Sequence, residues 1–200
     1  MKAHKPLVIC VTGKMGSGKS TVTALFNTLY GVPVYDADSR ARMLMETPRL
    51  KSEIIRLFGP RAYERGVLNR AYLAHRVFGD PAALKRLEQI VHPRVREDLE
   101  EWLEAHRNEK MVLVENAILF KSGMYPLCDK VLFVTAPDSV LLKRLKKDRQ
   151  MTENQIRARW KHQDFDTITS KKNIIFIQNN KSLRELLTKV KELYRNFVDI

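Results

Sequence analysis

The chain has 200 residues, 44% of them hydrophobic and 30% charged, which is typical of a globular protein and excludes a disordered or collagen-like chain. Its 36 Lys and Arg against 23 Asp and Glu give a formal net charge of +13, which favours polyanionic partners: nucleotides, nucleic acid or an anionic membrane surface. No apolar run approaches the roughly 20 residues that cross a bilayer, and no signal peptide is evident. We therefore expect one compact, soluble domain.

The two cysteines, Cys10 and Cys128, show neither a CxxC motif nor the spacing of a zinc site. Cys10 lies in an expected buried strand, where a cysteine acts as a small hydrophobic residue. A reducing compartment fits this pattern best, so we expect the protein in the cytoplasm.

Short β-branched segments alternate along the chain with amphipathic segments of helical period. The expected strands are residues 7–11, 32–35, 111–114, 131–134 and 174–177. The expected helices are residues 20–29, 49–58, 70–77, 81–90, 93–106, 139–147, 152–162 and 183–197. This alternation predicts an α/β fold with a five-stranded parallel sheet flanked by helices.

Two regions interrupt the alternation. Residues 39–106 are almost wholly helical, which indicates an inserted helical lobe of about residues 39–107. Residues 143–172 hold ten Lys and Arg against four Asp and Glu, and we expect them to form a basic lid. The remaining residues, 6–38, 108–142 and 173–200, then make up the core of a single domain.

Residues 13–20, Gly-Lys-Met-Gly-Ser-Gly-Lys-Ser, match the pattern G-x-x-x-x-G-K-[ST] between an expected strand and an expected helix. The glycines let the backbone turn its N–H groups toward phosphate oxygens, and the helix dipole adds to the attraction. Lys19 is expected to reach the β- and γ-phosphates, and Ser20 to help hold Mg²⁺. The pattern predicts a three-layer P-loop NTPase fold that binds a nucleoside triphosphate.

Two carboxylates, Asp36 and Asp38, follow the second expected strand, at the edge of a parallel sheet where ligands bind. In an extended chain they point to the same side. One could accept the proton of an acceptor hydroxyl while the other caps the helix that begins near Ser39, or both could merely cap it. We favour catalysis by one of them.

Five segments together make the chain similar to the dephospho-CoA kinases: VTGKMGSGKST at 11–21, VPVYDAD at 32–38, LNRAYLAHRVFGDP at 68–81, LEQIVHPRVR at 87–96 and LFKSGMY at 119–125. They cover nearly the whole chain in the order of that family. The resemblance implies that ATP phosphorylates the ribose 3′-hydroxyl of dephospho-CoA, the last step of coenzyme A synthesis, with Mg²⁺ as cofactor. It also implies that the helical lobe binds the acceptor.

Roles follow for the matching positions. The expected ATP-binding residues are Gly13, Gly16, Ser17, Gly18, Lys19, Ser20, Thr21, Asn179 and Asn180. The expected catalytic residues are Asp38 as general base, Lys19, and Arg144 as a lid cation. Asp36, His92, Arg94 and Glu115 are expected to lie at the acceptor substrate. Mg²⁺ is expected at Ser20, through phosphates and water.

The chain departs from the family pattern at several positions. Lys14 stands where the family usually has glycine, and Glu115-Asn116-Ala117 replaces Asp-Val-Pro. Glu115 keeps a carboxylate at the end of a strand, where it could bind a Mg²⁺-bound water, cap a helix or pair with a lysine. Arg159 and Gln163 keep the usual Arg-x-x-x-Gln spacing, but Phe165-Asp166-Thr167 replaces Thr-Arg-Glu.

Alternatives remain open at this point. His92 could be a structural residue at a helix start, with Pro93 in the first helical position, and Arg144 could belong to a solvated helix face. The acceptor could be a nucleoside, a nucleotide or another small metabolite. The charge also permits a nucleotide-controlled protein that binds nucleic acid, although no nucleic-acid module is recognisable. We favour small-molecule partners, without nucleic acid or membrane, for a monomer or small homo-oligomer.

Overall fold

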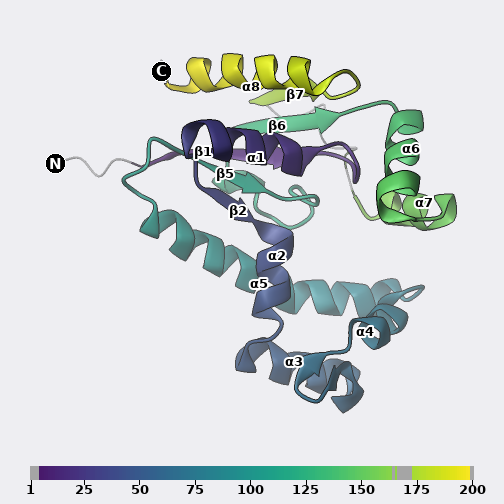
Figure 1. Cartoon of the computed structure of the whole chain (residues 1–200). Helices are drawn as coiled ribbons and strands as arrows, with labels where there is room; N and C mark the ends of the chain where they lie inside the picture. Colours follow the sequence, from purple (N-terminus) through teal and green to yellow (C-terminus); the bar gives the residue numbers. More distant parts are fainter. Residues whose placement is uncertain (1–4, 164, 166–172, 199–200) are drawn as a thin grey trace. The chain divides into compact units, whose positions relative to one another are not determined.

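A computed structural model describes residues 5–163, 165 and 173–198, and the chain divides into two compact units (Figure 1). One unit comprises residues 1–36 and 103–200, the other residues 37–102, and each has its own cluster of buried hydrophobic side chains. Part of the expected lid, residues 164 and 166–172, lies outside the described residues, and with it the family departures at Asp166 and Thr167.

The first unit is built on a five-stranded parallel sheet in the order β2-β5-β1-β6-β7. Its strands are β1 (Leu7–Thr12), β2 (Val34–Asp36), β5 (Met111–Glu115), β6 (Lys130–Thr135) and β7 (Ile174–Gln178). Each falls within two residues of an expected strand at either end. β1 has partners on both sides, and Val8 to Val11 are fully buried, which explains their unbroken apolar sequence. The predicted fold class is confirmed.

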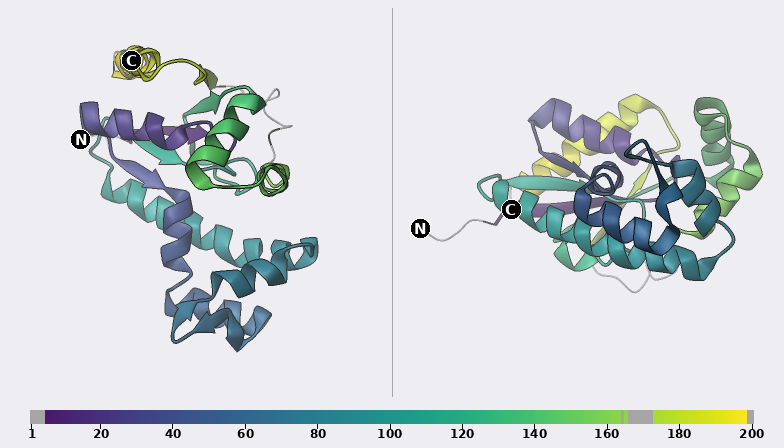
Figure 2. Two further views of the ribbon diagram at one scale, coloured as in Figure 1. Left: turned by 45° about the vertical axis from the view of Figure 1, so that its right-hand side comes forward. Right: turned by 90° about the horizontal axis from the view of Figure 1, so that it is seen from below.

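The helices of this unit lie close to their expected positions. They are α1 (Lys19–Tyr30), α6 (Asp138–Arg149), α7 (Glu153–Lys161) and α8 (Leu183–Val198), with a 3₁₀ turn, η2, at Tyr125–Leu127. α1 and α8 lie side by side and bury Phe26 and Val190 in one cluster with the strands (Figure 2). The rings of Tyr30 and Tyr194 stack between these helices, with centroids 3.6 Å apart.

The second unit contains α2 (Ala37–Leu44), α3 (Pro48–Phe58), η1 (Pro60–Ala62), β3 (Tyr63–Glu64), β4 (Val67–Leu68), α4 (Arg70–Val77) and most of α5 (Pro81–Ala105). Ile54, Phe58 and Leu73 are among the buried residues of its core. The guanidinium of Arg40 on α2 donates to the carboxylate of Asp98 on α5, with its Nε 2.7 Å from Oδ2, so the first and last helices of the unit are tied together.

A small hairpin in this unit corrects the expectation of an almost wholly helical region. β3 and β4 are antiparallel, with Tyr63 opposite Leu68 and Glu64 opposite Val67. The two residues between them, Arg65 and Gly66, have φ values of 49° and 89°. Positive φ at both central residues is what a two-residue hairpin turn requires, and the Gly at its second position meets that requirement without strain.

The helix α5 corrects a second expectation. The sequence predicts two helices that meet near His92, but Pro81–Ala105 form one continuous helix of 25 residues with Pro93 inside it. Pro93 removes one backbone hydrogen bond. Val91, Val95 and Leu99 are nevertheless buried at a spacing of four residues, so one apolar stripe continues past the proline. The interpretation of His92 as a residue at a helix start is therefore wrong.

Cys10 and Cys128 form a disulfide, with their Cα atoms 5.7 Å apart. Cys10 lies in the central strand β1, and Cys128 lies between η2 and β6. Cys10 is thus buried as expected, but it is half of a covalent link rather than a simple hydrophobic residue. The cysteines consequently no longer argue for a reducing compartment.

We expect reduction of this disulfide to lower the free energy of unfolding by about 2–5 kcal/mol, because the bond restricts the unfolded chain across a sequence separation of 118 residues. Denaturant unfolding with and without a reductant measures the difference. The variant Cys128→Ser is the control, since its midpoint should not respond to reductant. An identical wild-type midpoint under both conditions would contradict the prediction.

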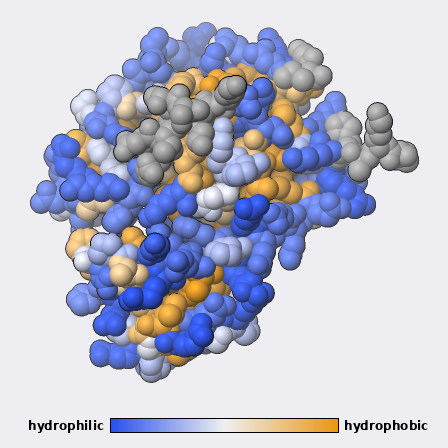
Figure 3. All heavy atoms as spheres, turned by 180° about the vertical axis from the view of Figure 1, so that it is seen from behind, coloured by the Kyte–Doolittle hydropathy of each residue, from blue (hydrophilic) through white to orange (hydrophobic). Residues whose placement is uncertain are grey.

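Hydrophilic residues cover most of the face drawn in Figure 3, with hydrophobic residues gathered between them. The large hydrophobic side chains exposed in the described part of the chain are Leu29, Met43, Val67, Phe78, Phe176 and Leu183. No helix among the described residues combines the length and the apolar character needed to cross a membrane.

Candidate active site

The glycine-rich loop of residues 13–20 connects β1 to α1, as the sequence predicts, and we call it the phosphate loop. Its glycines have φ values of 144° at Gly13, 86° at Gly16 and 95° at Gly18, a region that side chains disfavour. Space is also limiting, because a Cβ on Gly18 would lie 2.2 Å from Asn179 Nδ2. The conformation therefore depends on glycine. The N–H groups of Met15 and Ser17 are bonded within the protein, and other N–H groups of the loop can form an anion nest.

Lys19 is the first residue of α1, and only 8% of it is exposed. Its ammonium group donates to the carbonyl oxygen of Gly13 at 3.1 Å and lies 3.4 Å from that of Lys14. The cation is thus held against the loop, where it can transfer its hydrogen bonds to phosphate oxygens. Lys14 points elsewhere, since its ammonium pairs with the Asp138 carboxylate at 2.8 Å.

Glu115 connects the end of β5 to the start of α1. Its Oε1 accepts from the Ser20 hydroxyl at 2.7 Å and its Oε2 accepts from the Thr23 hydroxyl at 2.9 Å. In the sheet register, Glu115 also lies opposite Asp36 of the neighbouring strand β2. Of the roles considered for Glu115, neither helix capping nor a lysine pair matches these contacts. Thr23, which fixes half of the carboxylate, was not singled out by the sequence.

The donor atoms at this edge fit Mg²⁺. Hydroxyl and carboxylate oxygens are the ligands that this ion prefers, and it is commonly held by one or two protein groups together with substrate phosphates. Ser20 and Glu115 supply such oxygens beside the phosphate loop. Within residues 5–163, 165 and 173–198, no three His, Cys, Asp or Glu side chains come together as a metal site. The paired oxygens of Ser20 and Glu115 suit a metal that arrives with phosphate.

Arg144, Asn179 and Ser17 form a chain of contacts from α6 to the phosphate loop. The Arg144 guanidinium donates to the backbone carbonyl of Asn179 at 2.8 Å. The Asn179 amide nitrogen donates in turn to the backbone carbonyl of Ser17 at 2.7 Å. Arg144 is part-buried and is connected to the loop through Asn179, unlike its exposed neighbours Lys143 and Lys146. The solvated-face interpretation does not hold for Arg144.

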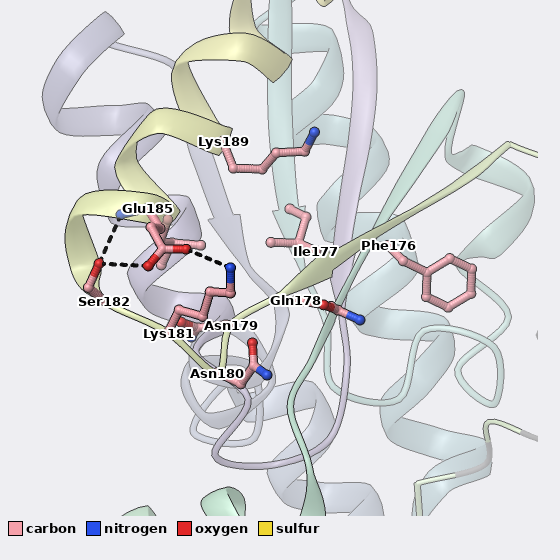
Figure 4. Close-up of a pocket in the computed structure, with 10 residues that line it drawn as sticks. Phe176, Ile177, Gln178, Asn179, Asn180, Lys181, Ser182, Glu185 and Lys189 are labelled. Carbon is pink, nitrogen blue, oxygen red and sulfur yellow. Dashed lines mark hydrogen bonds and ion pairs between the residues drawn. The ribbon is translucent and has the colours of Figure 1, made fainter.

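A pocket of about 340 Å³ lies at the turn from β7 to α8 (Figure 4). Asn179 and Asn180 line it, together with Phe176, Glu185 and Lys189. Hydrogen bonds from the Lys181 ammonium and the Ser182 hydroxyl help to hold the pKa of the Glu185 carboxyl below its ordinary value. The volume falls in the range of small-molecule pockets. Asn179, which lines the pocket, also contacts the phosphate loop at Ser17.

The two aspartates fall in different elements. Asp36 ends β2 in the first unit, whereas Asp38 lies in the first turn of α2 in the second unit and is exposed. The expectation that both point to the same side of an extended chain is wrong, because the helix begins at Ala37. A carboxylate in the first turn is favoured by the helix dipole. The catalytic role of Asp38 stays a prediction.

His92 and Arg94 lie within α5, in the second unit. The Arg94 guanidinium donates to both carboxylate oxygens of Glu97 at 2.8 Å and lies 3.8 Å from the Glu53 carboxylate on α3. Its side chain is only 22% exposed, so the two acids fix the direction of the cation. The roles of His92 and Arg94 toward an acceptor stay predictions, as do those of Thr21 and Asn180, which are exposed.

Comparison with known proteins adds a consistent set of relatives. The model of one family, described as "CoaE: Dephospho-CoA kinase", matches residues 7–185. A curated relative, the dephospho-CoA kinase of Porphyromonas gingivalis, is 39% identical over 139 residues, which cover 69% of this chain and 68% of that protein.

Solved structures agree over nearly the full length. The crystal structure of TT1252 from Thermus thermophilus has a TM-score of 0.81 and 34% sequence identity, and the match covers 96% of this chain and 98% of that one. The dephospho-CoA kinase from Campylobacter jejuni has a TM-score of 0.71 and 25% identity, covering 97% of this chain and 98% of that one.

Proposed function

Because the chain belongs to the dephospho-CoA kinase family, we propose that it transfers the terminal phosphate of ATP to the ribose 3′-hydroxyl of dephospho-CoA. The products are coenzyme A and ADP, and the reaction is the final step of coenzyme A biosynthesis. The observation that carries the proposal is the meeting of the phosphate loop, Ser20 and Glu115 at one edge of the sheet, where a metal-bound triphosphate fits. The family match identifies the acceptor as dephospho-CoA.

The residues that bind ATP belong to the first unit. The backbone amides of the phosphate loop and the Lys19 ammonium hold the β- and γ-phosphates. Arg144, directed at the loop through Asn179, offsets charge on the transferring phosphoryl group. Ser20 and Glu115 would hold Mg²⁺ on the protein side, and the bound ion would offset negative charge on the phosphates. Asn179 and Asn180 line the pocket at the β7–α8 turn, and this pocket receives the nucleoside part of ATP.

The acceptor is bound and activated by the carboxylates of Asp36 and Asp38 and by residues of the second unit. Asp38 accepts the proton of the 3′-hydroxyl as that oxygen bonds to the γ-phosphorus and the bond from the γ-phosphorus to the ADP oxygen breaks. Asp36, His92, Arg94 and Glu115 lie at the acceptor. The carboxylates of Glu53 and Glu97 keep the Arg94 cation in a fixed direction, so the side chain loses little conformational freedom when an anionic group binds it.

The substrates indicate the cellular compartment in which the enzyme works. ATP and a coenzyme A precursor are intracellular metabolites, so we propose that the enzyme works in the cytoplasm, as a monomer or small homo-oligomer. Its positive charge then serves small polyanionic substrates rather than nucleic acid or membrane.

The test is an assay of ADP release with dephospho-CoA and Mg-ATP. We expect turnover with dephospho-CoA, a product that carries one added phosphate on the ribose 3′-oxygen, and loss of turnover when EDTA removes Mg²⁺. A panel of nucleoside monophosphates, tested under the same conditions, is the control for the acceptor. Faster turnover of any panel member, or phosphate at another oxygen, would overturn the proposal.

A further inference from the structure

Trp160, in the last turn of α7, and Gln163, two residues past the end of that helix, both contact the phosphate loop. The Gln163 Oε1 accepts from the backbone N–H of Met15 at 2.8 Å, and its Nε2 donates to the backbone carbonyl of Ala117 at 3.1 Å. The Trp160 indole N–H donates to the Met15 carbonyl oxygen at 3.3 Å. Both polar backbone groups of one loop residue are therefore bound by residues about 145 positions later.

Neighbouring loop residues are tied to the same part of the chain. The Lys14 ammonium lies 5.0 Å from the centre of the Trp160 ring and pairs with Asp138 at the start of α6. Leu145 of α6 packs on Gly16, where an added Cβ would lie 2.9 Å from the leucine Cγ. Residues 14–16, the outer half of the phosphate loop, thus rest on α6 and on the end of α7.

Such ties matter because a glycine-rich loop has little conformational preference of its own. Its amides must be oriented before a phosphate can bind, and the cost of ordering them reduces affinity unless other contacts order them beforehand. Lys19, which follows residues 14–16 in the loop, reaches the β- and γ-phosphates. A displaced outer half therefore weakens contacts to the terminal phosphates more than contacts to the nucleoside.

We propose that Gln163 is a positioning residue for ATP: its amide holds residues 14–16 in the conformation that receives the β- and γ-phosphates. Gln163 suits this task because the two ends of one amide bind two loops, the phosphate loop and the segment that follows Glu115. The first of these loops contains Lys19, and the second begins directly after Glu115; both side chains belong to the proposed function, on which this inference rests. Gln163 would act through the loop backbone rather than through a contact with substrate.

The experiment compares Gln163→Met, which has a similar length but no amide, with Lys161→Met at an exposed position of the same helix end. Dissociation constants for ATP, ADP and AMP are measured by calorimetric titration in the presence of Mg²⁺. We expect Gln163→Met to raise those for ATP and ADP by about fivefold or more, since two hydrogen bonds are lost, and to leave the constant for AMP within about twofold. Lys161→Met should match the wild type for all three.

Two further readouts separate positioning from a merely structural role. In turnover, Gln163→Met should raise KM for ATP while KM for dephospho-CoA stays unchanged, and thermal unfolding should show that the variant is folded. Gln163→Asn, which keeps the amide but is too short to reach both loops, should resemble Gln163→Met. Unchanged ATP affinity in the folded variant, or equal losses for ATP and AMP, would overturn the proposal.

The nucleotide titrations need no acceptor. A wild-type protein that ignores dephospho-CoA would therefore refute the proposed function and still leave the role of Gln163 to be decided by its own measurement.

Discussion

Replacing Asp38 with Asn is expected to lower kcat by about 10²–10⁴-fold, because the amide cannot take the proton of the 3′-hydroxyl. The substitution keeps the shape of the side chain, and the first unit alone carries the phosphate loop, so the dissociation constant for ATP should stay within about twofold. Steady-state assays with dephospho-CoA, combined with a direct ATP titration, measure both quantities.

Asp36→Asn is the matched control for that variant. Asp36 lies two residues earlier but ends a strand, and its proposed role is binding, so its loss should raise KM for dephospho-CoA more than it lowers kcat. Near-normal turnover by Asp38→Asn would remove Asp38 from its role. A larger fall in kcat for Asp36→Asn would transfer that role to Asp36.

Lys19→Ala is expected to lower kcat by about 10²–10³-fold, since its ammonium is a buried cation of the phosphate loop and, in the proposed function, offsets charge that grows during transfer. Affinity for ATP should fall as well, because the same group binds the phosphates in the ground state. Single-turnover rates at saturating ATP separate the two effects.

The control for this variant is Lys14→Ala, five residues earlier in the same loop. Its ammonium lies in an exposed ion pair with Asp138, so the change should cost no more than about fivefold in kcat/KM. Equal losses for the two variants would show that general loop charge, rather than the placement of Lys19, decides activity.

The parts of the fold that follow from local pattern were predictable. Each strand of the five-stranded sheet contains Val or Ile, and the phosphate loop is a contiguous motif between a strand and a helix. The break expected in α5 was wrong because burial of the apolar stripe of Val91, Val95 and Leu99 outweighs the one backbone hydrogen bond that Pro93 removes.

The sequence predicted which residues form the candidate site better than it predicted the contacts between them. Glu115 could be noticed as a carboxylate at a strand end, but its bonds to Ser20 and Thr23 join residues more than 90 positions apart. Gln163 could be noticed only for its spacing from Arg159, because its two partners are far away in sequence. No local periodicity encodes such pairs, and they appear only when the sheet brings the loops together.

The positions of the bonded sulfur atoms have a topological consequence. Cys10 precedes the whole of residues 37–102 and Cys128 follows them, so the second unit lies inside the covalent ring that the bond closes. A protease that cuts once anywhere in that unit leaves two fragments joined through sulfur. Electrophoresis without thiol would show a single species of almost unchanged mass, and the nick would become visible only after the sulfur link is opened.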